Sequence, residues 1–315
     1  MTRPAVVALG GGHGLAASLS ALRLVTDRIT AVVTVADDGG SSGRLREEFN
    51  VLPPGDLRMA LAALCDDTAW GHQWRDVLQH RFAGEGQLGG HAVGNLLIVS
   101  LWDLLGDTVG GLDLVGRLLN AQGRVLPMAA VPLNIEASVM GADPGQPLEI
   151  TTVRGQLEVA TTTGRVLSVQ LNPEKPPACE EAVAAIREAD WVILGPGSWF
   201  TSVMPHLLVP GIRDSLIDTP ARRILTLNLV MATGETEGFS AENHLEALAL
   251  HAPDLHLDVV LADPGIVGDQ PVLRRSAGRV GAARGAARLR PRGQDGPPER
   301  VPPAPPPTDD LGYRA

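Results

Sequence analysis

The order of the first 36 residues constrains this chain most: apolar strand, glycine-rich loop, helix, then a second strand. Residues 4–9 form a short apolar run, and the β-branched run at 29–36 (ITAVVTVA) is typical of a strand buried on both faces. Between these runs Leu15, Leu19 and Leu22 recur at helical spacing. The pattern predicts a βαβ unit with a right-handed crossover, and hence a parallel sheet.

Strand and helix patterns continue to alternate along most of the chain. Helices are expected at 44–49, 57–64 (with Asp56 as N-cap), 91–105, 113–120, 180–189 and 241–250, and strands at 190–194, 224–230 and 258–262. This alternation predicts an α/β fold of the Rossmann-like, doubly wound kind, with a mostly parallel sheet covered on both faces.

Two segments depart from that pattern. Within about 130–172 the apolar period changes to alternation, including residues 155–161, which predicts an antiparallel β-arm inserted into the α/β domain of residues 1–270. Residues 271–315 are rich in arginine and proline and have few large apolar side chains. They are either a disordered basic tail or the product of a reading-frame shift in a GC-rich gene.

Charge and composition exclude several functions. The net charge of −10 argues against bulk binding of nucleic acid, which needs a basic surface. The longest apolar run, residues 96–105, is interrupted by Asp103, so no membrane span is expected. Cys65 and Cys179 have no zinc or redox spacing. A cytoplasmic protein is therefore expected.

The first glycine loop is a candidate phosphate site. Glycines between a strand and a helix let the backbone approach a ligand closely, and the helix N-terminus favours a negative group. The loop also matches the loose dinucleotide pattern G-x-G-x-x-A, although a tight turn would need only one or two of these glycines. The candidate residues are Gly10, Gly11, Gly12, His13 and Gly14.

Two acids, Asp37 and Asp38, follow the second strand. In Rossmann sites an acid near this point accepts hydrogen bonds from ribose hydroxyls, and adjacent carboxylates can also hold magnesium. A plain Asp-Gly turn is the alternative. Ser41, Ser42 and Arg44 add hydroxyls and a cation within a few residues, which favours a ligand.

Further candidates lie at predicted helix starts. Arg58, two residues after Asp56, is either a phosphate clamp or a solvated side chain. His91 and Asn95 are four residues apart, hence on one helix face, where they either face the ligand site or have a structural role.

A second glycine loop repeats the strand, turn and helix order of the first. It contributes Gly195, Gly197 and Ser198, followed by the hydroxyls of Thr201 and Ser202. Asn228 ends a later strand, with Glu235 shortly after. The carboxyl ends of parallel strands share one edge of a sheet, where ligands bind, so both loops and Asn228 are expected there.

Five segments resemble the YvcK family of gluconeogenesis factors, relatives of the CofD 2-phospho-L-lactate transferases. They are ALGGGHGL, ITAVVTVADDGGSSGRLR, LPPGDLRMALAAL, GHAVGNLLI and GPGSWFTSVMPHLLV, within a resemblance from about Val6 to Asp263. The resemblance implies a Rossmann-like fold, UDP-N-acetylglucosamine binding without a required cofactor, and control of cell shape and wall synthesis on gluconeogenic carbon. His13 and Phe200 depart from it, since threonine and tyrosine are usual there, and so does the tail.

These observations leave alternatives open. The first is a nucleotide-sugar-binding regulator without turnover. The second is a CofD-like transferase that joins a phospholactyl group to a deazaflavin, with magnesium held by Asp37 and Asp38. A nicotinamide dehydrogenase is a weaker third. The expected partner is a small nucleotide ligand; homo-oligomers and regulatory protein partners stay open.

Overall fold

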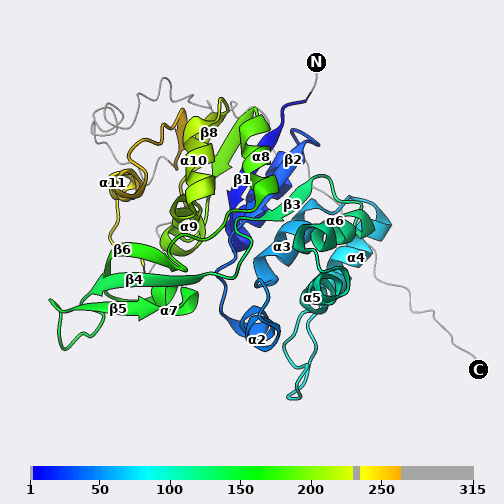
Figure 1. The fold of residues 1–315 in the computed structure, drawn as a ribbon, viewed down its shortest axis with the longest axis horizontal. Coiled ribbons are helices and arrows are strands. Elements are labelled where there is room, and N and C mark those ends of the chain that lie inside the picture. Colours follow the sequence, from blue (N-terminus) through cyan, green and yellow to red (C-terminus); the bar gives the residue numbers. More distant parts are fainter. Residues whose placement is uncertain (1–2, 230–234, 264–315) are drawn as a thin grey trace, which may run out of the picture. The chain divides into compact units, whose positions relative to one another are not determined.

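The computed structural model describes residues 3–229 and 235–263, which form a parallel sheet with helices and a smaller antiparallel sheet (Figure 1). The described part of the large sheet has six strands in the order β3-β2-β1-β7-β8-β9, and all pairs are parallel. The strands are β1 (Val6–Gly10), β2 (Ile29–Val33), β3 (Arg124–Pro127), β7 (Trp191–Leu194), β8 (Arg222–Thr226) and β9 (Val259–Leu261). The predicted doubly wound, mostly parallel fold is confirmed.

The strand order reverses between β1 and β7. From β1 the chain winds outward through β2 to β3, then returns to pair β7 with the other side of β1. Open α/β sheets bind ligands at such a switch point, outside the carboxyl ends of the strands. The two glycine loops follow these two central strands.

Helices cover the sheet in two groups. In the first, α1 packs against α3, which also contacts β2 and β3; in the second, α10 contacts α8 and α9, and α9 contacts α11. Because right-handed crossovers wind in opposite directions from β1, the groups lie on opposite faces. The helices are α1 (Gly12–Leu22), α2 (Gly40–Phe49), α3 (Gly55–Leu64), α4 (Ala69–Gln79), α5 (Val93–Leu105), α6 (Thr108–Leu118), α8 (Glu180–Glu188), the π-helical turn η1 (Trp199–Val203), α9 (Met204–Leu208), α10 (Pro210–Asp218) and α11 (Ala241–His251).

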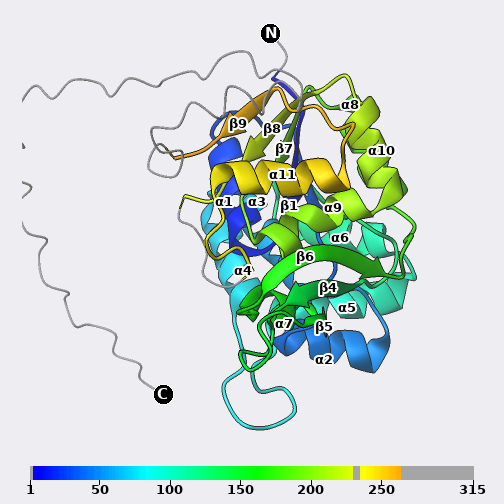
Figure 2. The same ribbon diagram turned by 90° about the vertical axis from the view of Figure 1, so that its left-hand side faces the viewer.

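The predicted antiparallel arm is present, with the strand order β5-β4-β6. It comprises β4 (Asn134–Met140), β5 (Ile150–Arg154), helix α7 (Gln156–Thr161) and β6 (Arg165–Asn172), and it lies at the same end of the sheet as α2 (Figures 1 and 2). The expected strand at 155–161 is wrong. Gly155 has φ +102° and breaks the strand, and α7 begins directly after it.

Several boundaries differ from the sequence-based prediction. Asp56 is not an N-cap, because α3 begins at Gly55 and Asp56 lies in its first turn. His91 precedes α5, which begins at Val93, and α2 begins at Gly40 rather than Arg44. Strand β8 ends at Thr226, so Asn228 lies beyond it. Helix α4 and strand β3 were not predicted. The tail at 271–315 lies outside the described residues.

The core is built from small and medium aliphatic side chains, as the low aromatic content of 3% requires. All five residues of β1 are buried, and Leu15 and Leu19 of α1 pack into the same cluster. Burying a side chain of this size stabilises a fold by about 1.5–3 kcal/mol. Within the described residues, no helix has both the length and the apolar character needed to span a membrane.

Candidate functional site

The two glycine loops are in direct contact at the switch point. The first follows β1 and the second follows β7, whose residues pair in register from Val6 with Trp191 to Leu9 with Leu194. A Cβ atom at Gly14 would overlap the carbonyl of Pro196. Gly14 is therefore required by packing between the loops, whether or not a ligand approaches it.

Asn228 fixes the second loop. Its Oδ1 atom accepts from the backbone N–H of Gly197 at 2.9 Å, and its Nδ2 atom donates to the carbonyl of Gly197 at 2.9 Å. Gly197 has φ +155°, a conformation that favours glycine. Asn228 thus lies at the predicted edge, and its amide group positions the loop.

The hydroxyls of the second loop converge on a buried acid. Thr201 donates to Ser198 at 2.5 Å, and Ser198 donates to Oε1 of Glu235 at 2.5 Å. The backbone N–H of Phe200 also donates to this oxygen, at 3.2 Å. Glu235 is 3% exposed, and burial raises the pKa of its carboxyl group. Ser202 is buried beneath Gly197.

Asp37 and Asp38 serve different neighbours although they are adjacent. Asp37 Oδ1 accepts from the N–H of Gly39 at 3.0 Å, and its carboxylate lies beside Gly55. Asp38 accepts from the N–H groups of Gln156 at 2.9 Å and Leu157 at 3.4 Å, at the start of α7. Asp38 therefore ties the loop after β2 to the arm.

The residues that are described fit a magnesium site poorly. They contain no group of three or more Asp, Glu, His or Cys side chains that could hold a metal ion. Asp38 is already bonded to backbone N–H groups of α7. We therefore derive no step through a metal at Asp37 and Asp38.

Asp56 reaches the N-terminus of α1, where it accepts a hydrogen bond from the backbone N–H of Gly12. Burial and the nearby Asp37 carboxylate raise the pKa of Asp56 to about 7, although the Gly12 bond and Arg58 oppose the rise. Asp37 and Asp56 thus form an acid pair next to the first glycine loop. A proton on Asp56 is exchangeable near neutral pH.

Four predicted site residues form one buried network. Ser41 Oγ lies 3.0 Å from Nδ1 of His91 and accepts from Nδ2 of Asn95 at 3.0 Å. Asn95 Oδ1 in turn accepts from Nε of Arg58 at 2.8 Å. Exposure of these side chains is between 1% and 6%. The network connects α2, α3 and α5 although its members lie up to 54 residues apart.

Two further predicted residues near this network, Arg44 and Ser42, contact the protein itself. Arg44 donates to the carbonyls of Gly89 at 2.8 Å and Gln87 at 3.3 Å, which fixes the loop before α5. Ser42 is buried against Gly55. His91 has its pKa lowered, first by burial and then by Arg44.

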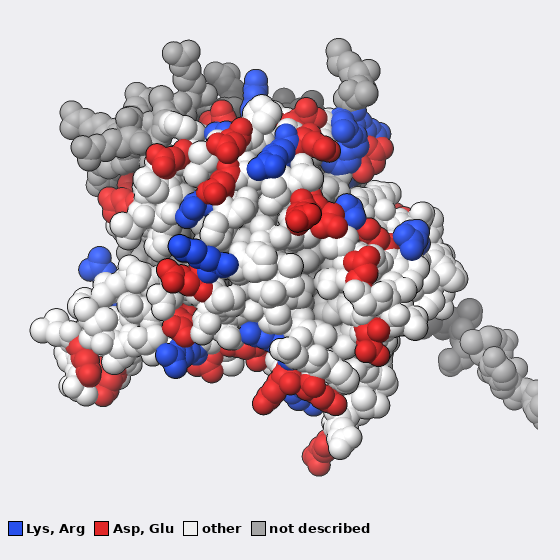
Figure 3. Space-filling view, viewed as in Figure 1, with Lys and Arg blue, Asp and Glu red and all other residues white. Residues whose placement is uncertain are grey.

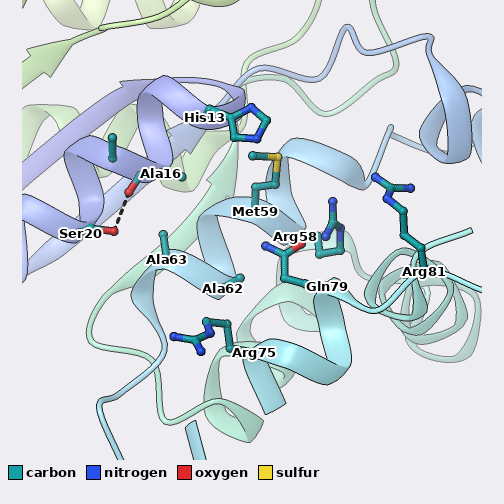
Figure 4. A pocket seen from close by; sticks show the side chains of 11 residues that line it. His13, Ala16, Ser20, Arg58, Met59, Ala62, Ala63, Arg75, Gln79 and Arg81 are labelled. Atoms are coloured by element: carbon teal, nitrogen blue, oxygen red, sulfur yellow. Dashed lines mark hydrogen bonds between the residues drawn. The ribbon is translucent and has the colours of Figure 1, made fainter. Parts of the chain in front are cut away.

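A pocket of about 530 Å³ lies beside the first loop, between α1, α3 and α4 (Figure 4). It is lined by His13 and Arg58, which the sequence singled out, and by Arg75, Gln79 and Arg81, which it did not. We call it the arginine pocket. The sequence held one indication of these residues. Arg75 and Gln79 are four residues apart and would share one face of a helix, but α4 itself was not predicted.

Comparisons with known proteins show the family of this chain. Residues 6–282 match the family model described as 2-phospho-L-lactate transferase CofD. This chain belongs to the CofD family. The match continues past Asp263, where the resemblance of the motifs ended.

Within the CofD family, the chain is similar to proteins named as gluconeogenesis factors. A protein of Mycobacterium tuberculosis with this name is 55% identical over 275 residues, which cover 86% of this chain and 80% of the relative. The gluconeogenesis factor of Bacillus subtilis is 37% identical over 268 residues, or 85% of this chain and 81% of the relative. A crystal structure of a UPF0052 family member from Bacillus halodurans matches with TM-score 0.75 and 35% identity, covering 89% of this chain and 86% of that one.

Proposed function

We propose that this chain is a regulatory protein that binds UDP-N-acetylglucosamine at the carboxyl ends of β1 and β7. In this proposal it acts as a gluconeogenesis factor, needed for cell shape and wall synthesis on gluconeogenic carbon. The contact between the two glycine loops at the switch point carries the proposal, because it joins two phosphate-compatible turns into one surface. The names of the similar proteins support the same role.

Asp37 is the residue that we assign to the ribose. It follows β2, the strand next to β1, which is where an acid accepts ribose hydroxyls in Rossmann sites. Its Oδ1 atom accepts one backbone N–H, which leaves further acceptor capacity on the carboxylate.

Calorimetry with UDP-N-acetylglucosamine tests the proposal. Asp37→Ala should weaken binding by about tenfold or more, since a hydrogen bond to a charged group contributes about 1.5–3 kcal/mol. Asp214→Ala is the control, because Asp214 is an exposed acid paired with Arg213, away from the loops. No binding to an intact, cooperatively folded chain would overturn the proposal.

A second candidate is a CofD-like transferase that joins a phospholactyl group to a deazaflavin. Two observations favour it: the family match, and the carboxyl group of Asp56, whose pKa of about 7 suits a general acid or base near neutral pH. Product formation from a phospholactyl donor and the deazaflavin, slowed in Asp56→Asn, would rank this function first. An unchanged rate in Asp56→Asn would remove Asp56 from the mechanism.

A further inference from the structure

The arginine pocket concentrates positive charge in an acidic protein. Its lining contains Arg58, Arg75, Arg81 and His13, and no aspartate or glutamate. The whole chain has a net charge of −10, and acidic and basic groups are interspersed on the face shown in Figure 3. A local excess of this kind focuses an electrostatic field that attracts anions.

Arg58 presents its guanidinium group to the pocket. The residue is 4% exposed and its Nε atom is bonded to Asn95, whereas its two terminal nitrogens make no hydrogen bond within the described residues and are not fully buried, so they remain open to the pocket. Burial, and then repulsion by Arg81, lower the pKa of Arg58 to about 10, although the nearby carboxylates of Asp56 and Asp37 oppose the shift. An oxyanion between the guanidinium groups of Arg58 and Arg81 would accept hydrogen bonds from both, since guanidinium binds phosphate and carboxylate through paired N–H donors.

The other arginines are supported from outside the pocket. Arg75 is bonded to Asp76 at 2.9 Å on the exposed surface of α4, and Arg81 donates to the carbonyl of Gly90 at 2.9 Å. Each guanidinium retains further donors, because the group carries five N–H bonds. Figure 4 shows Arg58 and Gln79 in the pocket, with His13 from α1 at one end and Arg75 at the other.

The pocket also has an apolar wall. Ala16 of α1 and Met59, Ala62 and Ala63 of α3 line it together with the arginines. Its volume of about 530 Å³ is within the range of pockets that enclose small ligands. A polymer such as RNA would need an extended basic surface rather than one local cluster of arginines.

We propose that the arginine pocket binds a small phosphorylated metabolite, with its phosphate group on Arg58 and Arg81 and its carbon skeleton against Met59 and Ala62. The pocket adjoins the proposed nucleotide surface, because His13 of the first glycine loop lines it, but its arginines come from α3, from α4 and from the segment after α4. Phosphate binding by these arginines does not require a nucleotide at the carboxyl ends of β1 and β7. The inference therefore does not depend on the proposed function.

Calorimetry tests it with two probes, inorganic phosphate and glycerol 3-phosphate. The variant is Arg75→Gln combined with Arg81→Gln, which leaves the buried Arg58 network intact. We expect both probes to bind, glycerol 3-phosphate more tightly, and both to weaken by about tenfold or more in the variant. Binding should also weaken as salt is added.

Arg213→Gln is the matched control. Arg213 is an exposed arginine bonded through Nε and one terminal nitrogen to the next residue, Asp214, as Arg75 is to Asp76. Its replacement should leave phosphate binding unchanged. Thermal unfolding checks that each variant keeps a cooperative fold.

Three results would overturn the inference: no binding of either probe to the folded chain, equal binding by the wild type and the double variant, or displacement of bound phosphate by UDP-N-acetylglucosamine. The third would make the pocket part of the nucleotide surface. Failure of UDP-N-acetylglucosamine to bind at all, with phosphate still bound, would count against the proposed function alone.

Discussion

Asp56→Asn tests the acid pair through the pH dependence of stability. The folded pKa of about 7 lies above the ordinary value of 3.8, so between these values the folded protein binds the proton that the unfolded chain releases. The contribution of Asp56 to the free energy of unfolding is therefore highest at low pH and falls as the pH rises toward 7. Asparagine keeps an oxygen for the N–H of Gly12 but cannot ionise.

The two pKa values set the magnitude. Relative to low pH, linkage at Asp56 lowers the free energy of unfolding by about 2 kcal/mol near pH 5 and by about 4 kcal/mol near pH 8. Asp56→Asn should therefore gain about 2–3 kcal/mol of stability relative to the wild type between about pH 5 and about pH 8.

Urea unfolding of both proteins across this pH range measures the difference directly. Groups common to both proteins cancel in the comparison. The reasoning is refuted if the free energies of unfolding of wild type and Asp56→Asn run parallel with pH.

Three further substitutions test the contacts of the site. Gly14→Ala should lower the melting temperature and separate the two loops, because a Cβ atom overlaps the Pro196 carbonyl. Gly86→Ala, with open space around it, should change the melting temperature little, and equal melting temperatures of the two variants would contradict this packing. Asn95→Leu should cost about 2–4 kcal/mol in denaturant unfolding, because it leaves the buried Nε of Arg58 unpaired. Asn228→Ala removes both hydrogen bonds to Gly197 and should cost about 1–3 kcal/mol while weakening nucleotide binding; calorimetry that shows wild-type affinity would separate Asn228 from the ligand surface.

The fold could be predicted because its signals are local. Strand β1, the glycine turn and the leucines of α1 occur within 22 residues, and their periods match one structure. The prediction for residues 155–161 is wrong because the two alternating apolar residues do not share one buried face: Val159 is fully buried, whereas Leu157 is 58% exposed, as positions two apart on a helix are. What decides for α7 is its contact with Asp38, 118 residues away in sequence.

The site was predictable as a set of residue types but not as an arrangement. The motifs indicated Ser41, Arg58 and Asn95 separately, and the fold joins them into one network. In contrast, Arg75 and Arg81 have no motif around them. They come together with Arg58 because α4 packs near α3 and brings them to the same pocket.

The bond between Asp38 and α7 has a mechanical consequence. Asp37, the residue assigned to the ribose, is covalently adjacent to Asp38, so a displacement of α7 is transmitted to Asp37 across a single peptide unit. If a ligand binds at Asp37 as proposed, its binding free energy and the position of the arm are therefore coupled, and by thermodynamic linkage the coupling acts equally in both directions.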